Sequence, residues 1–315
     1  MITFSLPRKN VPDISLLMQV QNQPDSYLID CGALQSFSIR HLQRVRAVFV
    51  SHTHVDHWID FDTLLRHQVQ HATEVTICGP AGITEHVGAK LRAYNWNLLD
   101  HRAVRYRVRE IVACDHVLLN RLSPPHYTPE AEGVIDDASP YQDESIRVDC
   151  ALLDHHIPSV AYRFSTPERV RLRLGNGDPV GGPWAGALKQ AFEDEAPDRP
   201  LRVEGRTRPA GELFHLVHRH PGSTAGVILD HAITPDNRTA IRTLFEGVDT
   251  VYIESYYLER DRTLALNKAH STAADSARVL SGLGITNAYP IHHSRKYSEI
   301  DIARLHEEFY LHFRP

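Results

Sequence analysis

A six-residue segment near the start of the chain is rich in side chains that bind divalent metals. His52-Thr53-His54-Val55-Asp56-His57 contains three imidazoles and one carboxylate, the ligands that zinc and similar ions prefer where no thiolate is present. His52 and His54 are two positions apart at the end of a predicted strand, so they point the same way. Asp56 and His57 fall at the start of the next predicted helix and turn toward a second position. One loop can therefore serve two metal ions, and the spacing is more specific than that of a surface histidine cluster.

The elements on either side of this segment must be a buried strand and a helix. Ala47-Val48-Phe49-Val50 is apolar throughout, which is typical of a strand covered on both faces. It ends directly at Ser51 and His52. From Trp58 to Gln70 apolar residues recur with helical spacing. The local architecture is therefore predicted to be strand, histidine-rich loop and helix.

Strands and helices are predicted to alternate along most of the chain, and two ranges stand apart. Residues 122–144 are rich in proline and acids and predict a loop. Residues 165–222 contain many glycines and prolines and the acidic run Glu193-Asp194-Glu195. They predict an arm inserted into one domain that spans residues 1–315, with a plain surface loop as the alternative. Further strands are predicted at residues 14–20, 26–30, 75–78, 226–230, 250–254 and 288–291, and helices at residues 38–45, 83–94 and 271–283.

Composition limits the classes of protein that remain. The 315 residues carry a net charge of −5. This charge does not indicate a protein that binds nucleic acid over its whole surface, although it is compatible with a local basic face. The first residues lack a basic region followed by an apolar run, and no apolar stretch approaches the ~18 residues of a membrane span. The four cysteines lack CxxC spacing and predict reduced thiols. We therefore expect a cytoplasmic protein without membrane association.

Further short motifs follow in order over roughly residues 5–300. Together with the histidine loop, this order resembles the metallo-β-lactamase superfamily, and within it the RNase Z family of tRNA 3′-processing endonucleases. The resemblance implies an α/β protein with the metallo-β-lactamase αββα four-layer sandwich, into which an arm is inserted. The matching motifs are Asp30-Cys31-Gly32, Asp154-His155, Asp230, Tyr252-Ile253-Glu254, His270-Ser271-Thr272 and His292-His293-Ser294-Arg295-Lys296-Tyr297.

The resemblance also implies a set of metal ligands for two ions per chain, zinc first and manganese as the alternative. The first ion is held by His52, His54 and His155. The second is held by Asp56, His57 and His292, and Asp230 bridges both. His156 and His293 neighbour two of these residues. Because adjacent side chains of an extended segment point to opposite faces, only one of each pair can face the metals, and the register of the resemblance favours His155 and His292.

Such a site predicts hydrolysis. Two ions lower the pKa of a shared water toward ~7, so that hydroxide attacks a phosphodiester, and they also stabilise the departing oxygen. Asp56 would orient this nucleophile. His270 would act as general acid, with Glu254 holding its imidazole; the alternatives are a structural hydrogen bond for His270 and an ordinary ion pair for Glu254. Ser294, Arg295 and Lys296 are expected to meet a substrate phosphate.

The predicted substrate is RNA, namely the 3′ trailer of pre-tRNA, and the resemblance implies a homodimer. Two departures concern the substrate. Leu229-Asp230-His231 stands where the family has Gly-Asp-Thr, and the acidic run in the arm would repel phosphates. A hydrolase of a small lactone, thioester, β-lactam or other small phosphodiester is the alternative, although the pair formed by His270 and Glu254 favours a leaving group that needs a proton. A binding protein without activity is a third hypothesis, which the complete ligand set disfavours.

Overall fold

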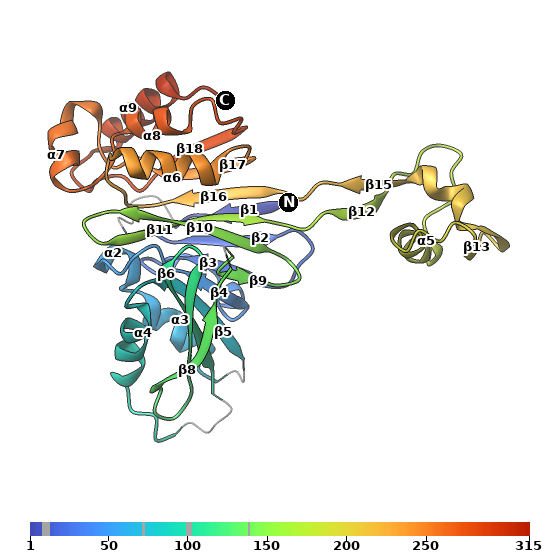
Figure 1. The fold of residues 1–315 in the computed structure, drawn as a ribbon, viewed down its shortest axis with the longest axis horizontal. Coiled ribbons are helices and arrows are strands. Elements are labelled where there is room, and N and C mark those ends of the chain that lie inside the picture. The colour runs from blue at the N-terminus through green and yellow to red at the C-terminus, as the bar shows by residue number, and fades with distance from the viewer. Residues whose placement is uncertain (8–12, 71–72, 99–102, 138) are drawn as a thin grey trace. The chain divides into compact units, whose positions relative to one another are not determined.

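The computed structural model describes residues 1–7, 13–70, 73–98, 103–137 and 139–315. These residues form two compact units, one made of residues 1–166 and 224–315 and the other of residues 167–223. Figure 1 shows the elements of both. The larger unit contains two mixed β-sheets.

The first sheet has parallel strands in its middle and antiparallel strands toward both edges. Its strands follow their order in the chain within the described residues. They are β1 (Ile2–Ser5), β2 (Leu16–Val20), β3 (Ser26–Ile29), β4 (Val45–Phe49), β5 (Glu74–Pro80), β6 (Arg105–Ala113), β7 (His116–Leu122) and β8 (Pro129–Ile135).

The second sheet combines a parallel part, β16 to β18, with antiparallel strands. It packs against the first sheet through a shared apolar core. Phe49 of the first sheet lies 5.4 Å from Tyr162 and 5.1 Å from Phe164 of the second, between ring centroids. Its spatial order is β18 (Asn287–Ile291), β17 (Thr250–Glu254), β16 (Thr224–Ile228), β11 (Pro158–Ser165), β10 (Arg147–Asp154) and β9 (Tyr141–Gln142).

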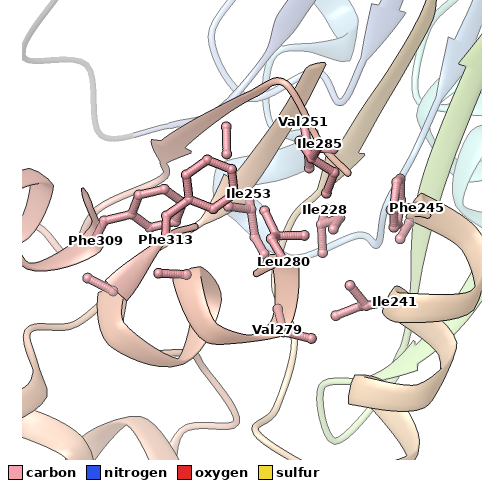
Figure 2. Close-up of a cluster of buried hydrophobic side chains, with 14 of the residues drawn as sticks. Ile228, Ile241, Phe245, Val251, Ile253, Val279, Leu280, Ile285, Phe309 and Phe313 are labelled. Carbon is pink, nitrogen blue, oxygen red and sulfur yellow. The ribbon is translucent and has the colours of Figure 1, made fainter. Parts of the chain in front are cut away.

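Helices cover the outer face of each sheet (Figure 1). α3 (Phe61–Gln68) and α4 (Ile83–Arg92) bury their apolar sides against the first sheet. α6 (Pro235–Phe245), α8 (Ala273–Leu280) and α9 (Glu299–His312) cover the second, and Figure 2 shows the core beneath them. The layers are helix, sheet, sheet and helix, which confirms the predicted αββα sandwich. Shorter helices are α1 (Ile39–Leu42), α2 (Val55–Trp58), the 3₁₀ turn η2 (Glu259–Asp261) and α7 (Arg262–Asn267).

Residues 167–223 have a small hydrophobic core of their own. Trp184 and Leu188 of α5 (Trp184–Glu193) pack with Leu201 and Leu213. Because these side chains are buried among themselves, the segment is more than a surface loop. Its other elements are β12 (Arg169–Leu172) paired with β15 (Val217–His220), β13 (Pro200–Val203) paired with β14 (Arg206–Pro209), and the 3₁₀ helix η1 (Ala210–Leu216).

Two local predictions were wrong. The range 122–144 was expected to be a loop, but residues 129–135 form β8 at the edge of the first sheet. An edge strand tolerates proline at its first residue and charged side chains, so it lacks the apolar pattern of a core strand. The helix expected from Trp58 to Gln70 is divided into α2 and α3 at Asp60, whose carboxylate accepts a hydrogen bond from the Leu34 amide at 2.6 Å.

Two predictions from composition can be compared with the described chain. Cys31, Cys78, Cys114 and Cys150 all carry free thiols. Among the helices of the described residues, none combines the length and apolarity that crossing a bilayer requires.

Candidate metal centre

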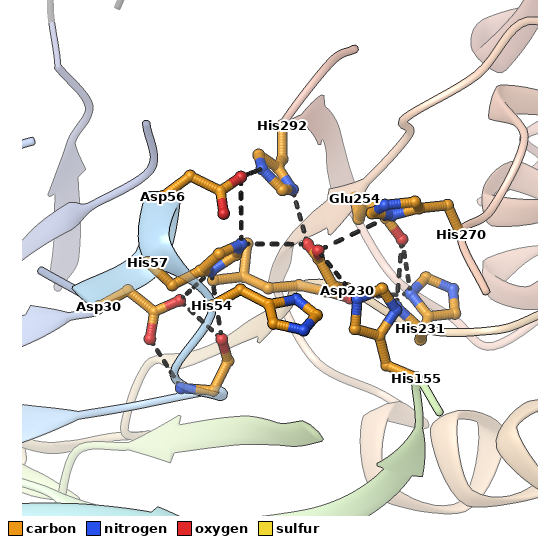
Figure 3. A network of polar contacts seen from close by, with 12 residues as sticks. Asp30, His54, Asp56, His57, His155, Asp230, His231, Glu254, His270 and His292 are labelled. Atoms are coloured by element: carbon orange, nitrogen blue, oxygen red, sulfur yellow. Dashed lines mark hydrogen bonds and ion pairs between the residues drawn. The ribbon is translucent and has the colours of Figure 1, made fainter. Parts of the chain in front are cut away.

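The candidate site lies where several strands of both sheets end. His52 and His54 follow β4, and His155 occupies the turn between β10 and β11. Asp230 lies two residues beyond β16, and His292 directly follows β18. Figure 3 shows His54, His155 and His292, from segments far apart in the sequence, around Asp230.

All seven predicted ligands and both predicted dyad residues belong to three touching groups. Within each group, potential ligand atoms lie within 4.8 Å of one another. Two of the groups share Asp230, and Asp230 also contacts His57 and His292 of the other group, so all three form one continuous site. They are His52, His54, His155 and Asp230; Asp56, His57 and His292; and Asp230, Glu254 and His270.

The two carboxylate oxygens of Asp230 face different groups of histidines. Oδ1 lies 2.7 Å from His292 Nδ1 and 3.4 Å from His57 Nε2. Oδ2 lies 3.4 Å from His155 Nε2 and 3.8 Å from His52 Nε2. One carboxylate can therefore contribute an oxygen to each of two neighbouring cations.

Three of the imidazoles are oriented through their other ring nitrogen. His57 Nδ1 lies 2.6 Å from Asp30, His155 Nδ1 lies 2.7 Å from the carbonyl oxygen of Ala269, and His52 Nδ1 lies 3.0 Å from Ser51 Oγ. Such partners fix the ring and leave Nε2 free for a metal. In each case Nε2 is the atom that faces Asp230.

Asp30 was not predicted to have a role in the site. Its carboxylate is buried and accepts hydrogen bonds from the backbone amide and hydroxyl of Ser51, at 2.7 and 2.6 Å. It thereby connects the end of β3 to the histidine loop. The position of Asp30 directly after a strand and before Cys31-Gly32 was the available signal, but the contact with His57 depends on tertiary structure.

Gly32 lies against the backbone of the histidine loop. The Ile14 amide donates to the carbonyl oxygen of Asp56 at 3.0 Å, and the Gly32 amide donates to that of Ile14 at 3.0 Å. The Cys31 amide donates to the carbonyl of His57 at 2.7 Å. These bonds fix the backbone that carries Asp56 and His57.

Burial and charge make the cluster a good fit for divalent cations. Burial lowers the pKa of His52 to about 2, so its imidazole is neutral and keeps a lone pair for a metal. Burial alone would raise the pKa of Asp230, but the charges of His292 and His57 outweigh it and hold that pKa well below its usual range. His57 Nε2, Asp230 Oδ1 and both ring nitrogens of His292 are buried without a hydrogen-bond partner of good geometry. Metal coordination would satisfy these atoms.

The histidines next to the predicted ligands lie elsewhere. His156 is exposed, and its backbone amide donates to Asp154 Oδ1 at 2.8 Å. His293 Nδ1 lies 3.0 Å from the carbonyl oxygen of Ser255, and its Nε2 lies 3.1 Å from His306 Nε2. Of the two pairs, therefore, only His155 and His292 belong to the cluster.

Glu254 and His270 form a dyad at the edge of the cluster. His270 Nδ1 makes a hydrogen bond with Glu254 Oε1. Burial raises the pKa of Glu254, but the charge of His270 and the hydrogen bonds from His231 and His270 more than offset it and lower that pKa to about 2. The carboxylate is therefore ionised at neutral pH and can stabilise a protonated imidazole.

Tyr256 stacks on the face of His270. Their ring centroids are 3.9 Å apart and their planes differ by 5°. The stack and the hydrogen bond to Glu254 together restrict the imidazole in two directions. No pattern in the sequence marked Tyr256, because the stack joins residues of two separate segments.

Replacing Tyr256 by leucine is expected to lower the kcat of phosphodiester hydrolysis about three- to tenfold, which corresponds to the loss of one ring stack. Tyr256→Phe keeps the ring and should retain most of the activity. Steady-state kinetics of both variants, with thermal unfolding as the check on folding, would measure the effect. Equal losses in the phenylalanine and leucine variants would contradict a role for stacking.

The two cations after His292 are already paired with carboxylates. Arg295 forms an ion pair with Asp13, and Lys296 Nζ lies 2.8 Å from Asp261. Ser294 is buried. In this arrangement neither cation is free for the substrate phosphate that they were expected to meet.

The sequence of this chain is similar to sequences of known proteins. A family model described as "Beta-lactamase superfamily domain" matches residues 26–120. The chain is 27% identical to a ribonuclease Z of Deinococcus radiodurans over 288 residues, covering 87% of this chain and 84% of that protein. It is 25% identical to a ribonuclease Z of Porphyromonas gingivalis over 300 residues, covering 92% and 85%.

Solved structures show the same fold at lower identity. The metallo-β-lactamase fold protein YhfI from Bacillus subtilis superposes with a TM-score of 0.57 at 13% identity, covering 99% of this chain and 92% of that one. The short form of human tRNase Z gives a TM-score of 0.53 at 15% identity, covering 94% and 93%.

Proposed function

Because this chain belongs to the metallo-β-lactamase superfamily and is a distant full-length homologue of ribonuclease Z, we propose that it is a dinuclear metal-dependent phosphodiesterase that cleaves RNA. The leading substrate is the 3′ trailer of pre-tRNA. The observation that carries the proposal is the position of Asp230: it belongs to one potential metal group and to the group with Glu254 and His270, and it contacts His57 and His292 of the second metal group.

The donor set determines the first part of the proposed chemistry. His52, His54 and His155 would hold one ion, Asp56, His57 and His292 the other, and Asp230 would contribute an oxygen to each. Imidazole and carboxylate ligands without thiolate suit zinc best and also accept manganese. When bound, two such ions would supply a water of lowered pKa and positive charge for the phosphate oxygens.

The chain's own residues would supply orientation and a proton. The Asp56 carboxylate belongs to the group with His57 and His292 and would orient the attacking water. His270 Nε2 would donate a proton to the departing sugar oxygen, while Glu254 stabilises the imidazolium through Nδ1. A sugar alkoxide is a poor leaving group and needs this proton, whereas an opened lactone needs it less. The dyad thus favours a diester with an alkoxide leaving group.

The inserted unit offers a cationic surface for phosphates. In the ribbon of β12 and β15, Arg169 lies opposite His220 and Arg171 opposite His218. Opposed residues share a face, and so do residues two positions apart. We call this face, which carries Arg169, Arg171, His218 and His220, the ribbon face. Within the described residues, no carboxylate forms an ion pair with any of these four side chains. The ribbon face is therefore available to contact RNA.

The acidic run of the same unit is partly neutralised. Asp194 Oδ2 lies 2.8 Å from Arg199 Nη2, and Asp194 Oδ1 accepts a hydrogen bond from Gln190. The predicted repulsion of RNA by this run is therefore weaker than its sequence indicates. The cationic ribbon face supports RNA as the substrate.

The free thiols of the four cysteines agree with the proposed cytoplasmic location.

The direct test compares the zinc-loaded protein on a 3′-extended pre-tRNA, on bis(p-nitrophenyl) phosphate and on a simple lactone. Cleavage of the pre-tRNA at one position, leaving a defined 3′ end, is the expected result. Turnover of the aryl diester alone would support phosphodiesterase activity but contradict pre-tRNA as the substrate. Turnover of the lactone alone would contradict phosphodiesterase activity.

Removing the general acid should affect substrates according to their leaving groups. His270→Ala is expected to slow RNA cleavage about 100-fold or more. It should slow hydrolysis of bis(p-nitrophenyl) phosphate only a few-fold, because p-nitrophenolate departs without a proton. Single-turnover rates at saturating protein would measure the chemical step. Equal slowing of both substrates would exclude His270 as the proton donor.

Removing charge from the ribbon face should weaken RNA binding without affecting the chemistry. The double variant Arg169→Ala, Arg171→Ala is expected to raise the KM for pre-tRNA and to reduce the dependence of log KM on log salt by about one to two units. Hydrolysis of bis(p-nitrophenyl) phosphate should not change. Arg219→Ala is the matched control, because Arg219 lies on the opposite face and pairs with Glu168. An unchanged KM and salt dependence would contradict RNA binding by this face.

A further inference from the structure

We infer that His231 is a positioning residue for the proposed reaction, because it fixes the Glu254 carboxylate in the orientation that holds His270 toward the departing oxygen. The inference rests on the proposed function. His231 directly follows the proposed ligand Asp230 and lies outside the proposed ligand set.

The two oxygens of Glu254 have separate partners (Figure 3). Oε1 accepts from His270. Oε2 accepts from the Ser271 hydroxyl at 3.1 Å and from the His231 backbone amide at 3.2 Å, and His231 Nδ1 also lies 3.2 Å from it. Because Glu254 is completely buried, water does not compete for these oxygens. The donors at Oε2 therefore determine the direction in which Oε1 points.

The hydrogen bonds of His231 determine which of its ring nitrogens carries a proton. Nδ1 lies 2.8 Å from the carbonyl oxygen of Leu229. A carbonyl oxygen only accepts, so Nδ1 must donate. The same edge of the ring faces Glu254 Oε2, and the side chain of His231 is buried. The hydrogen bond to Leu229 thus holds the N–H edge of the ring 3.2 Å from Glu254 Oε2, where its partial positive charge stabilises the carboxylate.

A small pocket with both polar and apolar walls adjoins the ring. Its volume is about 20 Å³, and its walls include His231, Ile233, Asn237 and Val279. That is room for about one water molecule. Phenylalanine at position 231 would fill the same space as the imidazole, so the loss of its N–H can be tested without enlarging this pocket.

The experiment compares His231→Phe, which keeps the ring and removes the N–H, with His231→Asn, whose amide can donate from nearly the position of Nδ1. Each zinc-loaded variant is assayed on short RNA and on bis(p-nitrophenyl) phosphate. We expect His231→Phe to lower kcat on RNA about 10- to 100-fold, with a much smaller loss on the aryl diester and an unchanged KM. His231→Asn should recover most of the lost activity. This pattern follows because only the alkoxide leaving group needs the proton of His270.

A spectroscopic measurement gives the same information without turnover. The imidazole N–H of His270 that donates to the buried carboxylate of Glu254 should give a downfield proton resonance, identified by its loss in His270→Ala. We expect it to disappear or move in His231→Phe and to persist in His231→Asn. Equal slowing on both substrates, or an unchanged resonance in His231→Phe, would overturn the role of His231. Failure of the wild-type protein to hydrolyse either diester would instead overturn the proposed function.

Discussion

Replacing Asp230 by asparagine is expected to lower kcat/KM on any phosphodiester by on the order of 10⁴-fold, as when one member of a catalytic unit is removed. Asp230 Oδ1 faces His57 and His292, while Oδ2 faces His52 and His155. An amide places a neutral oxygen on one side and an N–H donor on the other. It cannot supply an anionic oxygen to each of two cations, so both groups lose a ligand.

Metal content distinguishes this explanation from a general loss of folding. After dialysis against zinc, the wild-type protein should hold two ions per chain and Asp230→Asn fewer than two, by elemental analysis. Asp236→Asn is the matched control, because Asp236 is an exposed aspartate in the first turn of α6. A variant at Asp230 that retained two ions and wild-type turnover would refute the bridging role.

Replacing Gly32 by alanine should be the most destabilising small substitution near the site. A Cβ atom at this position would lie 1.7 Å from the carbonyl oxygen of Asp56 and 2.8 Å from that of Ile14. Both obstacles are backbone, so no flexible side chain can move aside. We expect the free energy of unfolding to fall by about 4 kcal/mol or more, because the segment that carries Asp56 and His57 must shift.

Urea unfolding of the zinc-loaded protein and its metal content would measure this effect. Gly186→Ala is a suitable control, because Gly186 lies inside α5 and a Cβ there meets nothing within 4 Å. Alanine at that helical position should leave stability unchanged or raise it by up to about 1 kcal/mol. A wild-type unfolding midpoint and full zinc content in Gly32→Ala would show that the loop accommodates the methyl group.

The sequence permitted prediction of those parts of the fold whose signals are local. β4 was predicted because its residues are apolar on both faces, and the histidine loop because its ligand types are adjacent in the chain. β8 was missed, since an edge strand with Pro129, Glu130 and Glu132 lacks the apolar pattern of a core strand. The separate core of residues 167–223 was missed for a related reason: its apolar residues are dispersed among glycines and prolines.

The side chains that orient the proposed ligands and the dyad could not be predicted from the sequence, because their roles depend on tertiary contacts. Asp30 reaches His57, His231 reaches Glu254, and Tyr256 stacks on His270. Each of these residue types commonly serves other purposes, and no spacing in the chain joins the members of a pair. The motif order indicated which residues come together, whereas the contacts that hold each ring in place had to come from the structure.

The dispersal of the candidate ligands along the chain has a consequence for biosynthesis. His52 is made early and His292 late, with more than two thirds of the protein between them. Because a polypeptide emerges from the ribosome with its N-terminus first, a growing chain contains the histidine loop long before it contains the ligands that complete either group. A partly synthesised chain therefore lacks the complete proposed metal centre, and both groups are complete only after His292 has been made and β18 has joined the second sheet.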